Sequence, residues 1–189
     1  MKTSNIMIVG VGGQGSLLAS KLLGKLLLNE GYDVKVSEVH GMSQRGGSVV
    51  TYVRYGEKVY SPIIDKGEAD FIVSFEKLEA ARYAEFLKPG GKIIVNSQEI
   101  EPMPVITGAM EYPHAALDNL SERGVDIDCI DALTPALEAG SAKAVNIVLM
   151  GRLSKSLGIN EDKWIAALKE TVAPKFVDMN VKAFTLGRK

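Results

Sequence analysis

Apolar positions along the chain form short continuous runs that alternate with helical stripes. Residues 5–11 (NIMIVGV) are an apolar run ending in glycine, which is typical of a strand buried on both faces of a parallel sheet. Residues 32–39 (YDVKVSEV) predict a second strand. Between them, leucines recur at helical spacing up to a stop at Gly31, namely Leu18, Leu22, Leu23, Leu26 and Leu27. These three pieces predict a right-handed βαβ unit.

The same patterns predict further elements to the end of the chain. A hairpin is expected near residues 48–61, because two β-rich arms surround Tyr55-Gly56-Glu57-Lys58. Thr134 before Pro135 predicts a helix N-cap, and two prolines make residues 101–108 a connector. Additional strands are expected at 70–75, 92–97 and 125–132, and helices at 76–87, 114–124, 141–158, 161–172 and 175–184.

Strands that alternate with helices predict a three-layer α/β/α, Rossmann-like domain. We expect one domain spanning residues 1–189. The sheet should be mixed but mostly parallel, because the hairpin near 48–61 brings in antiparallel strands. Trp164 and the leucine stripes are expected in the core, and Cys129 is expected to be a small core residue on a strand.

Charge and cysteine content remove several classes of function. The net charge is −1 and the pI about 6.2, so the protein has no global field for binding nucleic acid or an anionic membrane. The one cysteine, Cys129, excludes an internal disulfide and an iron–sulfur cluster held by this chain alone. The start lacks a secretory pattern, and Lys21 and Lys25 interrupt the longest apolar runs. We therefore expect a cytoplasmic protein.

A glycine-rich turn follows the first predicted strand. Gly10, Gly12, Gly13, Gln14 and Gly15 fit the G-x-G-x-x-G pattern between a strand and a helix. Glycines let the backbone approach a phosphate, and the helix N-terminus offers free N–H groups. The turn therefore predicts an anion or nucleotide site, although a tight crossover would also need glycine for packing alone.

Glu38 ends the second predicted strand, 23 residues after Gly15. In an NAD-dependent enzyme, an acid at this place binds the ribose hydroxyls. The crowded segment directly after it does not suit an open adenosine pocket, so Glu38 alone is weak support for a dehydrogenase.

A second loop follows this strand and contains Ser43, Gln44, Arg45, Gly46 and Gly47. Arg45 offers a planar fork of donors that suits phosphate or carboxylate, and Ser43 and Gln44 add neutral hydrogen bonds. Gly46 and Gly47 permit positive φ, so their N–H groups can form an anion nest. The loop leaves the carboxyl end of its strand, where open α/β sheets bind ligands. The alternative is a structural turn with a surface arginine.

Two other polar residues are candidates for this crevice. His40 is the one candidate acid or base near it, and the sequence shows no partner for His40. Asn146 lies in an apolar helix and needs a hydrogen-bond partner, which can be the glycine turn, a ligand or another subunit. Lys143 lies one turn earlier on the same face. No complete catalytic set is evident, and we assign no catalytic residue beyond the candidate His40.

Four segments together resemble a known family. In chain order they are IVGVGGQGSLLASKLLG, EVHGMSQRGGSV, AKAVNIVLMG and NVKAFTLG, and they cover almost the whole chain. They resemble the small, gamma-type subunit of 2-oxoacid:ferredoxin oxidoreductases. The run from His40 to Gly47 is most similar to the beta subunit of the indolepyruvate subgroup, since pyruvate- and oxoglutarate-type relatives tend to carry a Tyr-Gly-Pro-Glu-like run before Arg-Gly-Gly.

The resemblance implies oxidative decarboxylation of an aryl pyruvate, with transfer of the acyl group to coenzyme A. It implies that a large alpha subunit carries thiamine diphosphate and iron–sulfur clusters, and that ferredoxin accepts the electrons. This chain would bind no cofactor alone but would complete the active site and part of the coenzyme A surface. The matching residues are the glycine turn, the second loop and Asn146. No nucleic-acid or membrane partner is implied.

Two other functions stay open at this point. A stand-alone NAD(P)-dependent oxidoreductase would use the glycine pattern and Glu38, and it predicts that the isolated chain binds a nicotinamide nucleotide. A non-catalytic nucleotide-binding module agrees with the missing acid–base set, and it predicts ligand binding without redox chemistry.

Replacing Arg45 with Ala is expected to weaken the use of coenzyme A or of the oxoacid while leaving the fold intact. The reason is that the variant loses a charged, two-pronged donor and no apolar packing. Steady-state kinetics of the assembled enzyme, with circular dichroism of the chain as the folding control, measure both effects. Unchanged kinetics would remove this role from Arg45.

Overall fold

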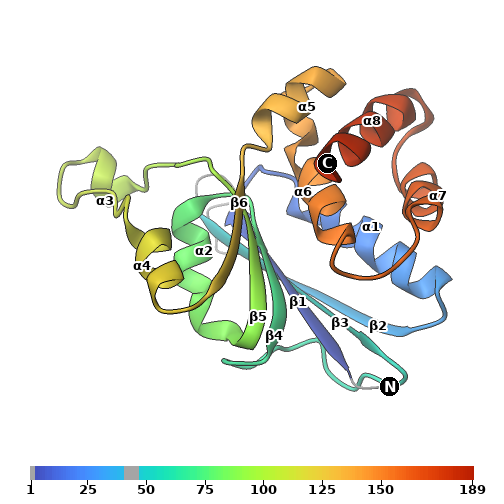
Figure 1. Cartoon of the computed structure of the whole chain (residues 1–189), viewed down its shortest axis with the longest axis horizontal. Helices are drawn as coiled ribbons and strands as arrows, with labels where there is room; N and C mark the ends of the chain where they lie inside the picture. Colours follow the sequence, from blue (N-terminus) through green and yellow to red (C-terminus); the bar gives the residue numbers. More distant parts are fainter. Residues whose placement is uncertain (1–2, 41–46) are drawn as a thin grey trace.

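Six strands form one sheet in this computed structural model, which describes residues 3–40 and 47–189. The strands are β1 (Ser4–Val11), β2 (Asp33–His40), β3 (Ser48–Gly56), β4 (Ala69–Ser74), β5 (Leu87–Asn96) and β6 (Asp126–Ile130). Their order across the sheet is β2-β3-β1-β4-β5-β6 (Figure 1). The pairs β1–β4, β4–β5 and β5–β6 are parallel, and β3 is antiparallel to both β1 and β2. The predicted mixed α/β sheet is confirmed.

The predicted position of the hairpin, near residues 48–61, is wrong. β3 runs unbroken from Ser48 to Gly56, and residues 57–61 leave the sheet. β3 pairs with β2 along its length, so the antiparallel connection crosses residues 41–47 instead. A local hairpin would give β3 one hydrogen-bonded edge. The observed position gives it two and buries Val50 and Val53 in cores on opposite faces.

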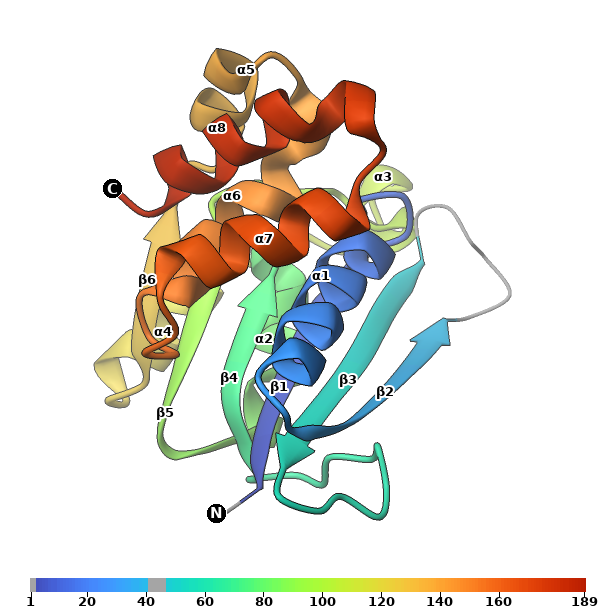
Figure 2. The same ribbon diagram turned by 90° about the vertical axis from the view of Figure 1, so that its right-hand side faces the viewer.

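Helices cover both faces of the sheet. α1 and α6 lie against one face with α7 and α8 outside them, whereas α2 and α4 cover the other face (Figures 1 and 2). Among the described residues, no helix combines the length and apolar character needed to cross a membrane. The helices are α1 (Ser16–Asn29), α2 (Lys77–Tyr83), α3 (Met103–Ile106), α4 (Ala116–Glu122), α5 (Leu133–Ala139), α6 (Val145–Ser154), α7 (Glu161–Thr171) and α8 (Val177–Gly187), with 3-10 turns at Ala84–Phe86, Ala142–Ala144 and Pro174–Phe176.

The start of α5 differs from the prediction. Thr134 lies inside the helix, and the carboxylate of Asp131 caps it instead. One oxygen of Asp131 accepts from the Leu133 and Thr134 amides at 2.9 and 3.2 Å, and the other accepts from the Thr134 hydroxyl at 2.6 Å. These bonds favour the ionised form and hold the pKa of Asp131 below its usual value. Asp131 offers two acceptor atoms where a Thr134 cap would offer one, which explains the earlier helix start.

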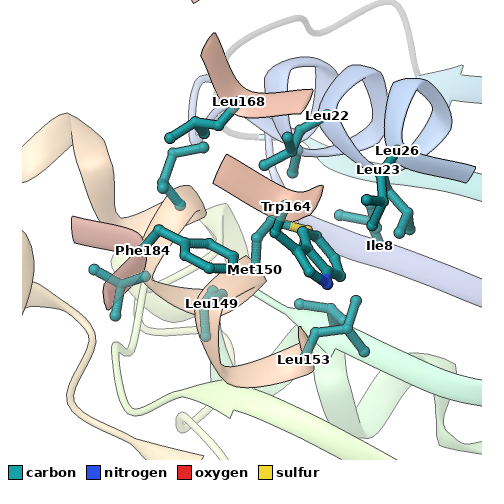
Figure 3. Close-up of a cluster of buried hydrophobic side chains, with 14 of the residues drawn as sticks. Ile8, Leu22, Leu23, Leu26, Leu149, Met150, Leu153, Trp164, Leu168 and Phe184 are labelled. Carbon is teal, nitrogen blue, oxygen red and sulfur yellow. The ribbon is translucent and has the colours of Figure 1, made fainter. Parts of the chain in front are cut away.

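The larger core lies between the sheet and the C-terminal helices. Trp164 of α7 is fully buried and packs against Phe184 of α8 with ring centroids 5.5 Å apart. Figure 3 shows Trp164 among side chains of α1, α6 and β1, including Leu23, Leu153 and Ile8. The core positions predicted for the leucine stripe and Trp164 are confirmed. Cys129 was expected in the core but is exposed, because β6 is an edge strand.

α6 and α8 approach each other through two glycines. A Cβ atom on Gly151 of α6 would fall on the carbonyl oxygen of Phe184, and one on Gly187 of α8 would fall on the carbonyl of Val148. Both obstacles are backbone atoms, so a side chain here cannot be absorbed by a rotamer change. The close approach positions the whole of α6, including its N-terminal end at the carboxyl edge of the sheet.

Replacing Gly151 with Ala is expected to lower the free energy of unfolding by about 3 kcal/mol, because the added methyl forces α6 and α8 apart. Gly24→Ala is the matched control in α1. Its Cβ would meet only Val36 at 3.6 Å, so helix propensity should leave stability unchanged or raise it by up to about 1 kcal/mol. Urea unfolding of both variants measures the difference. If Gly151→Ala and Gly24→Ala have equal free energies of unfolding, the close approach of α6 and α8 does not require glycine at position 151.

Candidate functional site

The glycine turn joins the carboxyl end of β1 to the start of α1. Gly13 and Gly15 have φ values of +99° and +86°, in the left-handed region that favours glycine. Gly10 has a different reason, since its Cβ would stand 2.8 Å from the Gln14 side-chain oxygen and 3.0 Å from the Phe75 ring. The pattern therefore serves both the tight turn and the packing beneath it.

The side chain of Gln14 forms hydrogen bonds at the ends of three strands. Its side-chain oxygen accepts from the Val11 amide at 2.7 Å, at the end of β1. Its side-chain nitrogen lies 3.2 Å from the Phe75 carbonyl after β4 and 3.2 Å from the Gln98 side-chain oxygen after β5. The strands β1 and β4 lead to helices on opposite faces, and ligands of open α/β sheets bind at such a switch point. Gln14 fixes the shape of this crevice.

Asn146, in the first turn of α6, forms a hydrogen bond with the glycine turn. Its side-chain nitrogen donates to the Gly15 carbonyl at 3.0 Å, and only 3% of the residue is exposed. A Cβ on Gly15 would stand 2.5 Å from that nitrogen, so the contact also requires glycine. The predicted need of Asn146 for a partner is confirmed, and the partner is the glycine turn. As a result, the N-terminal ends of α1 and α6 meet at one place.

The second loop starts and ends at the sheet edge that carries the glycine turn, and its end at Gly47 contacts that turn. The Gly47 carbonyl accepts from the Gly12 amide at 2.9 Å, and the backbone of His40, at the end of β2, pairs with Val49. Ser48 donates to the carboxylate of buried Glu79 on α2, which fixes the start of β3 from the other face. The predicted anion-binding residues Ser43, Gln44, Arg45 and Gly46 lie outside the described residues.

Two cavities flank the glycine turn, and Gly13 and Gly15 line both of them. The first, about 440 Å³, also contacts Ser16, Leu17, Val49 and Glu38. Glu38 accepts from the Ser16 hydroxyl at 3.2 Å, which places its carboxylate at the first turn of α1. The second cavity, about 480 Å³, contacts Lys143 and Val145 at the start of α6. Three more of its lining residues are Gln98, Ile100 and Leu133.

Sequence reasoning did not single out Gln98, Ile100 and Leu133. Gln98 and Ile100 follow the predicted strand at 92–97, and Leu133 follows the one at 125–132. Residues directly after parallel strands gather at the carboxyl edge of the sheet, so their positions carried a usable signal.

A separate polar cluster lies outside the glycine crevice. The Glu99 carboxylate bonds Lys77 at 3.0 Å and His114 at 2.9 Å, and chiefly the Lys77 contact lowers the pKa of Glu99. Cys129 lines a nearby cavity of about 260 Å³. Although Cys129 is exposed, neighbouring protein atoms displace part of the water around its thiol and raise the pKa of that thiol, so it is not activated as a nucleophile. Across residues 3–40 and 47–189, no group of three or more His, Cys, Asp and Glu side chains is placed to hold a metal ion.

Comparison with known proteins assigns the chain to a family. The family model for pyruvate ferredoxin/flavodoxin oxidoreductase matches residues 5–189. Indolepyruvate oxidoreductase subunit IorB from Thermococcus kodakarensis is 45% identical over 100% of this chain and 96% of its own length. The protein of the same name from Pyrococcus horikoshii is 44% identical, with the same coverage.

A solved structure supports the same fold. It is 2-oxoglutarate:ferredoxin oxidoreductase from Magnetococcus marinus with 2-oxoglutarate, coenzyme A and succinyl-CoA bound. The likeness covers 100% of this chain but 31% of that longer one, with a TM-score of 0.75 and 22% identity. The family-model match and the two sequence relatives span nearly the full length. The chain belongs to the pyruvate ferredoxin/flavodoxin oxidoreductase family.

Proposed function

We propose that this chain is the small subunit of a cytoplasmic 2-oxoacid:ferredoxin oxidoreductase that acts on indolepyruvate or a related aryl pyruvate. The 45% identity to an indolepyruvate oxidoreductase subunit over the whole chain supports the subgroup. A larger subunit would carry thiamine diphosphate and the iron–sulfur clusters, and ferredoxin would accept the electrons. This chain, as a single domain, would complete the active site and bind part of coenzyme A.

The observation that carries the proposal is the meeting of two helix N-termini beside Lys143. Gly15, the N-cap of α1, and Val145, the first residue of α6, both line the second cavity, and the side chain of Asn146 joins the two helix starts. A helix N-terminus carries positive potential, which favours an anion. The ammonium of Lys143 adds a full positive charge, and none of the described residues that line this cavity is acidic. The arrangement suits a phosphate group, and coenzyme A carries several.

The metal-ligating side chains of this chain agree with iron–sulfur clusters held by a partner subunit. Iron–sulfur clusters are ligated mainly by several cysteine thiolates, and this chain has only Cys129, exposed on the edge strand β6. In the proposed complex, decarboxylation and electron transfer would belong to groups on the larger subunit. The residues of this chain bind the ligand, orient it and shield it from water.

A stand-alone NAD(P)-dependent oxidoreductase is not favoured. In the dinucleotide-binding design, the strand with the acidic residue lies beside the first strand. Here β3 lies between β1 and β2, and the carboxylate of Glu38 already accepts from Ser16 of α1. The two sequence relatives described above are both named indolepyruvate oxidoreductase subunit IorB.

The subunit assignment predicts a partner-dependent activity. Under anaerobic conditions, an affinity-tagged chain should co-purify with a larger, iron-containing subunit, and the eluate should reduce viologen with indolepyruvate and coenzyme A. Pyruvate and 2-oxoglutarate are the substrate controls and should support slower reduction. The isolated chain should be inactive. A lone chain that binds NADH or NADPH tightly would overturn the proposal.

Replacing Lys143 with Gln is expected to raise the KM for coenzyme A about tenfold, which corresponds to about 1.4 kcal/mol for one charge-assisted phosphate contact. The kcat should change little, because the contact is the same in the bound substrate and in the transition state.

Lys155→Gln is the matched control, since Lys155 lies at the opposite end of α6. If both variants and the wild type have the same KM for coenzyme A, the phosphate does not bind in the second cavity. The assignment of the chain as a small subunit would be unaffected by that result.

A further inference from the structure

Gln98 lines the second cavity together with Lys143, and its backbone position is fixed from both sides. The carbonyl oxygen of Gln98 accepts from the Lys77 amide at 3.0 Å, at the start of α2. The amide of the preceding residue, Ser97, donates to the Ile130 carbonyl at 2.8 Å, at the end of β6. Gln98 itself is exposed. Its side chain therefore starts from a fixed point at the carboxyl edge of the sheet and reaches into the cavity.

Backbone groups fix the orientation of the first amide side chain next to Gln98, which is that of Gln14. The Gln14 side-chain oxygen accepts from the Val11 amide at 2.7 Å, and the nitrogen donates to the Phe75 carbonyl at 3.2 Å. A backbone N–H only donates and a backbone carbonyl only accepts, so exchanging the oxygen and nitrogen of Gln14 would break both bonds. The atom of Gln14 that faces Gln98 is therefore a nitrogen, which is a donor.

The second amide side chain next to Gln98 is that of Asn96, which is only 1% exposed. Its oxygen accepts from the Ala132 amide at 3.1 Å, and its nitrogen donates to the Phe75 carbonyl at 3.2 Å, so its orientation is fixed in the same way. The Gln98 side-chain oxygen thus faces two donors, the Gln14 nitrogen at 3.2 Å and the Asn96 nitrogen at 3.4 Å. A Gln98 nitrogen in that place would meet two other donors, so the amide of Gln98 has one favourable orientation.

The NH2 group of Gln98 is therefore turned away from the sheet edge. Oxygen and nitrogen lie on opposite sides of a planar amide, so an oxygen held by Gln14 and Asn96 leaves the nitrogen facing the cavity that Gln98 lines. Within residues 3–40 and 47–189, this NH2 group makes no hydrogen bond. It carries two donors and no acceptor, and the Lys143 ammonium that lines the same cavity also only donates. Both groups suit an oxygen atom of a ligand, and an anionic oxygen best.

We propose that Gln98 is a ligand-binding residue whose NH2 group donates to an oxygen of the phosphate that the Lys143 ammonium attracts. This inference rests on the proposed function, in which an anionic group of the substrate occupies the second cavity. An ammonium on a flexible stem acts as a point charge without a fixed direction. The NH2 group of Gln98 has a fixed direction, because Gln14 and Asn96 hold the other end of its amide. Gln98 thus orients the phosphate, and Lys143 supplies the charge.

The Gln98→Glu variant separates ligand binding from the structural role of the same residue. One carboxylate oxygen keeps the place of the amide oxygen and accepts from Gln14 and Asn96, whereas the other replaces the NH2 donors with a negatively charged acceptor. Urea unfolding should therefore give a free energy no lower than that of the wild type. Calorimetry on the full chain should show binding of inorganic pyrophosphate weakened about tenfold or more, since a hydrogen bond to a charged group is lost. In the assembled enzyme, the KM for coenzyme A should rise by a similar factor with little change in kcat.

Two further variants separate this effect from a general change in charge. Asn119→Asp adds the same single negative charge to α4, which covers one face of the sheet, and it should leave pyrophosphate binding unchanged. Gln98→Ala loses the donors without gaining a charge, so it should weaken pyrophosphate binding less than Gln98→Glu does. Gln98→Ala also identifies the side-chain NH2 resonances of Gln98 by their loss from the NMR spectrum. In the wild-type chain, these resonances should shift when pyrophosphate is added.

Equal pyrophosphate binding by Gln98→Glu and the wild type would overturn the inference, because the structural role alone would then account for Gln98. Absence of pyrophosphate binding by the wild-type chain, or NH2 resonances of Gln98 that stay in place when it binds, would also overturn it. If Gln98→Glu loses pyrophosphate binding but the tagged chain co-purifies with no iron-containing subunit, Gln98 remains an anion ligand and the proposed function fails. The two failures are therefore distinguishable.

Discussion

The burial of β1 between two apolar cores is the constraint on which the rest of the structure depends. Its side chains alternate, with Ile6 and Ile8 in the core under α1 and Met7 and Val9 in the core under α2. All four are fully buried, and each contributes about 1.5–3 kcal/mol relative to an exposed position. Against a net stability of about 5–15 kcal/mol for a typical protein, this strand cannot move without unfolding the domain. The glycine turn at its end is held equally firmly.

Contacts between segments that are distant in sequence then form a crevice around the end of β1. Gln14 joins the ends of β1, β4 and β5, Asn146 brings in α6, and the Gly47 carbonyl brings in the start of β3. Each contact uses at least one backbone group at a helix or strand end, where the regular ladder of hydrogen bonds stops. The described part of the crevice is therefore formed before a ligand arrives, which reduces the conformational entropy that this part loses on binding.

Local patterns in the sequence predicted most of the elements and the glycine turn. The hairpin near 48–61 was wrong because Tyr55-Gly56-Glu57-Lys58 carries a turn signal, whereas the pairing of β3 with β1 depends on contacts far apart in sequence. For the same reason, sequence could offer three partners for Asn146 but could not choose among them. Glu38 was considered only as a ribose ligand, because its contact with Ser16 requires the register of β2 on β3. Anion binding by residues 43–46 stays a prediction, which rests on the chemistry of their side chains and backbone N–H groups.

The antiparallel course of β3 has a consequence for the connection that precedes it. Since β3 returns between β1 and β2, the connection that leaves β2 re-enters the sheet at the same edge as the glycine turn. That connection is held at both ends by paired strands, at His40 with Val49 and at Gly47 with Gly12. The entropic cost of closing a loop between fixed ends rises slowly with its length, so a change of length there costs little free energy. A change of length between these two anchors therefore leaves the pairing of β3 with β1 and β2 as it is.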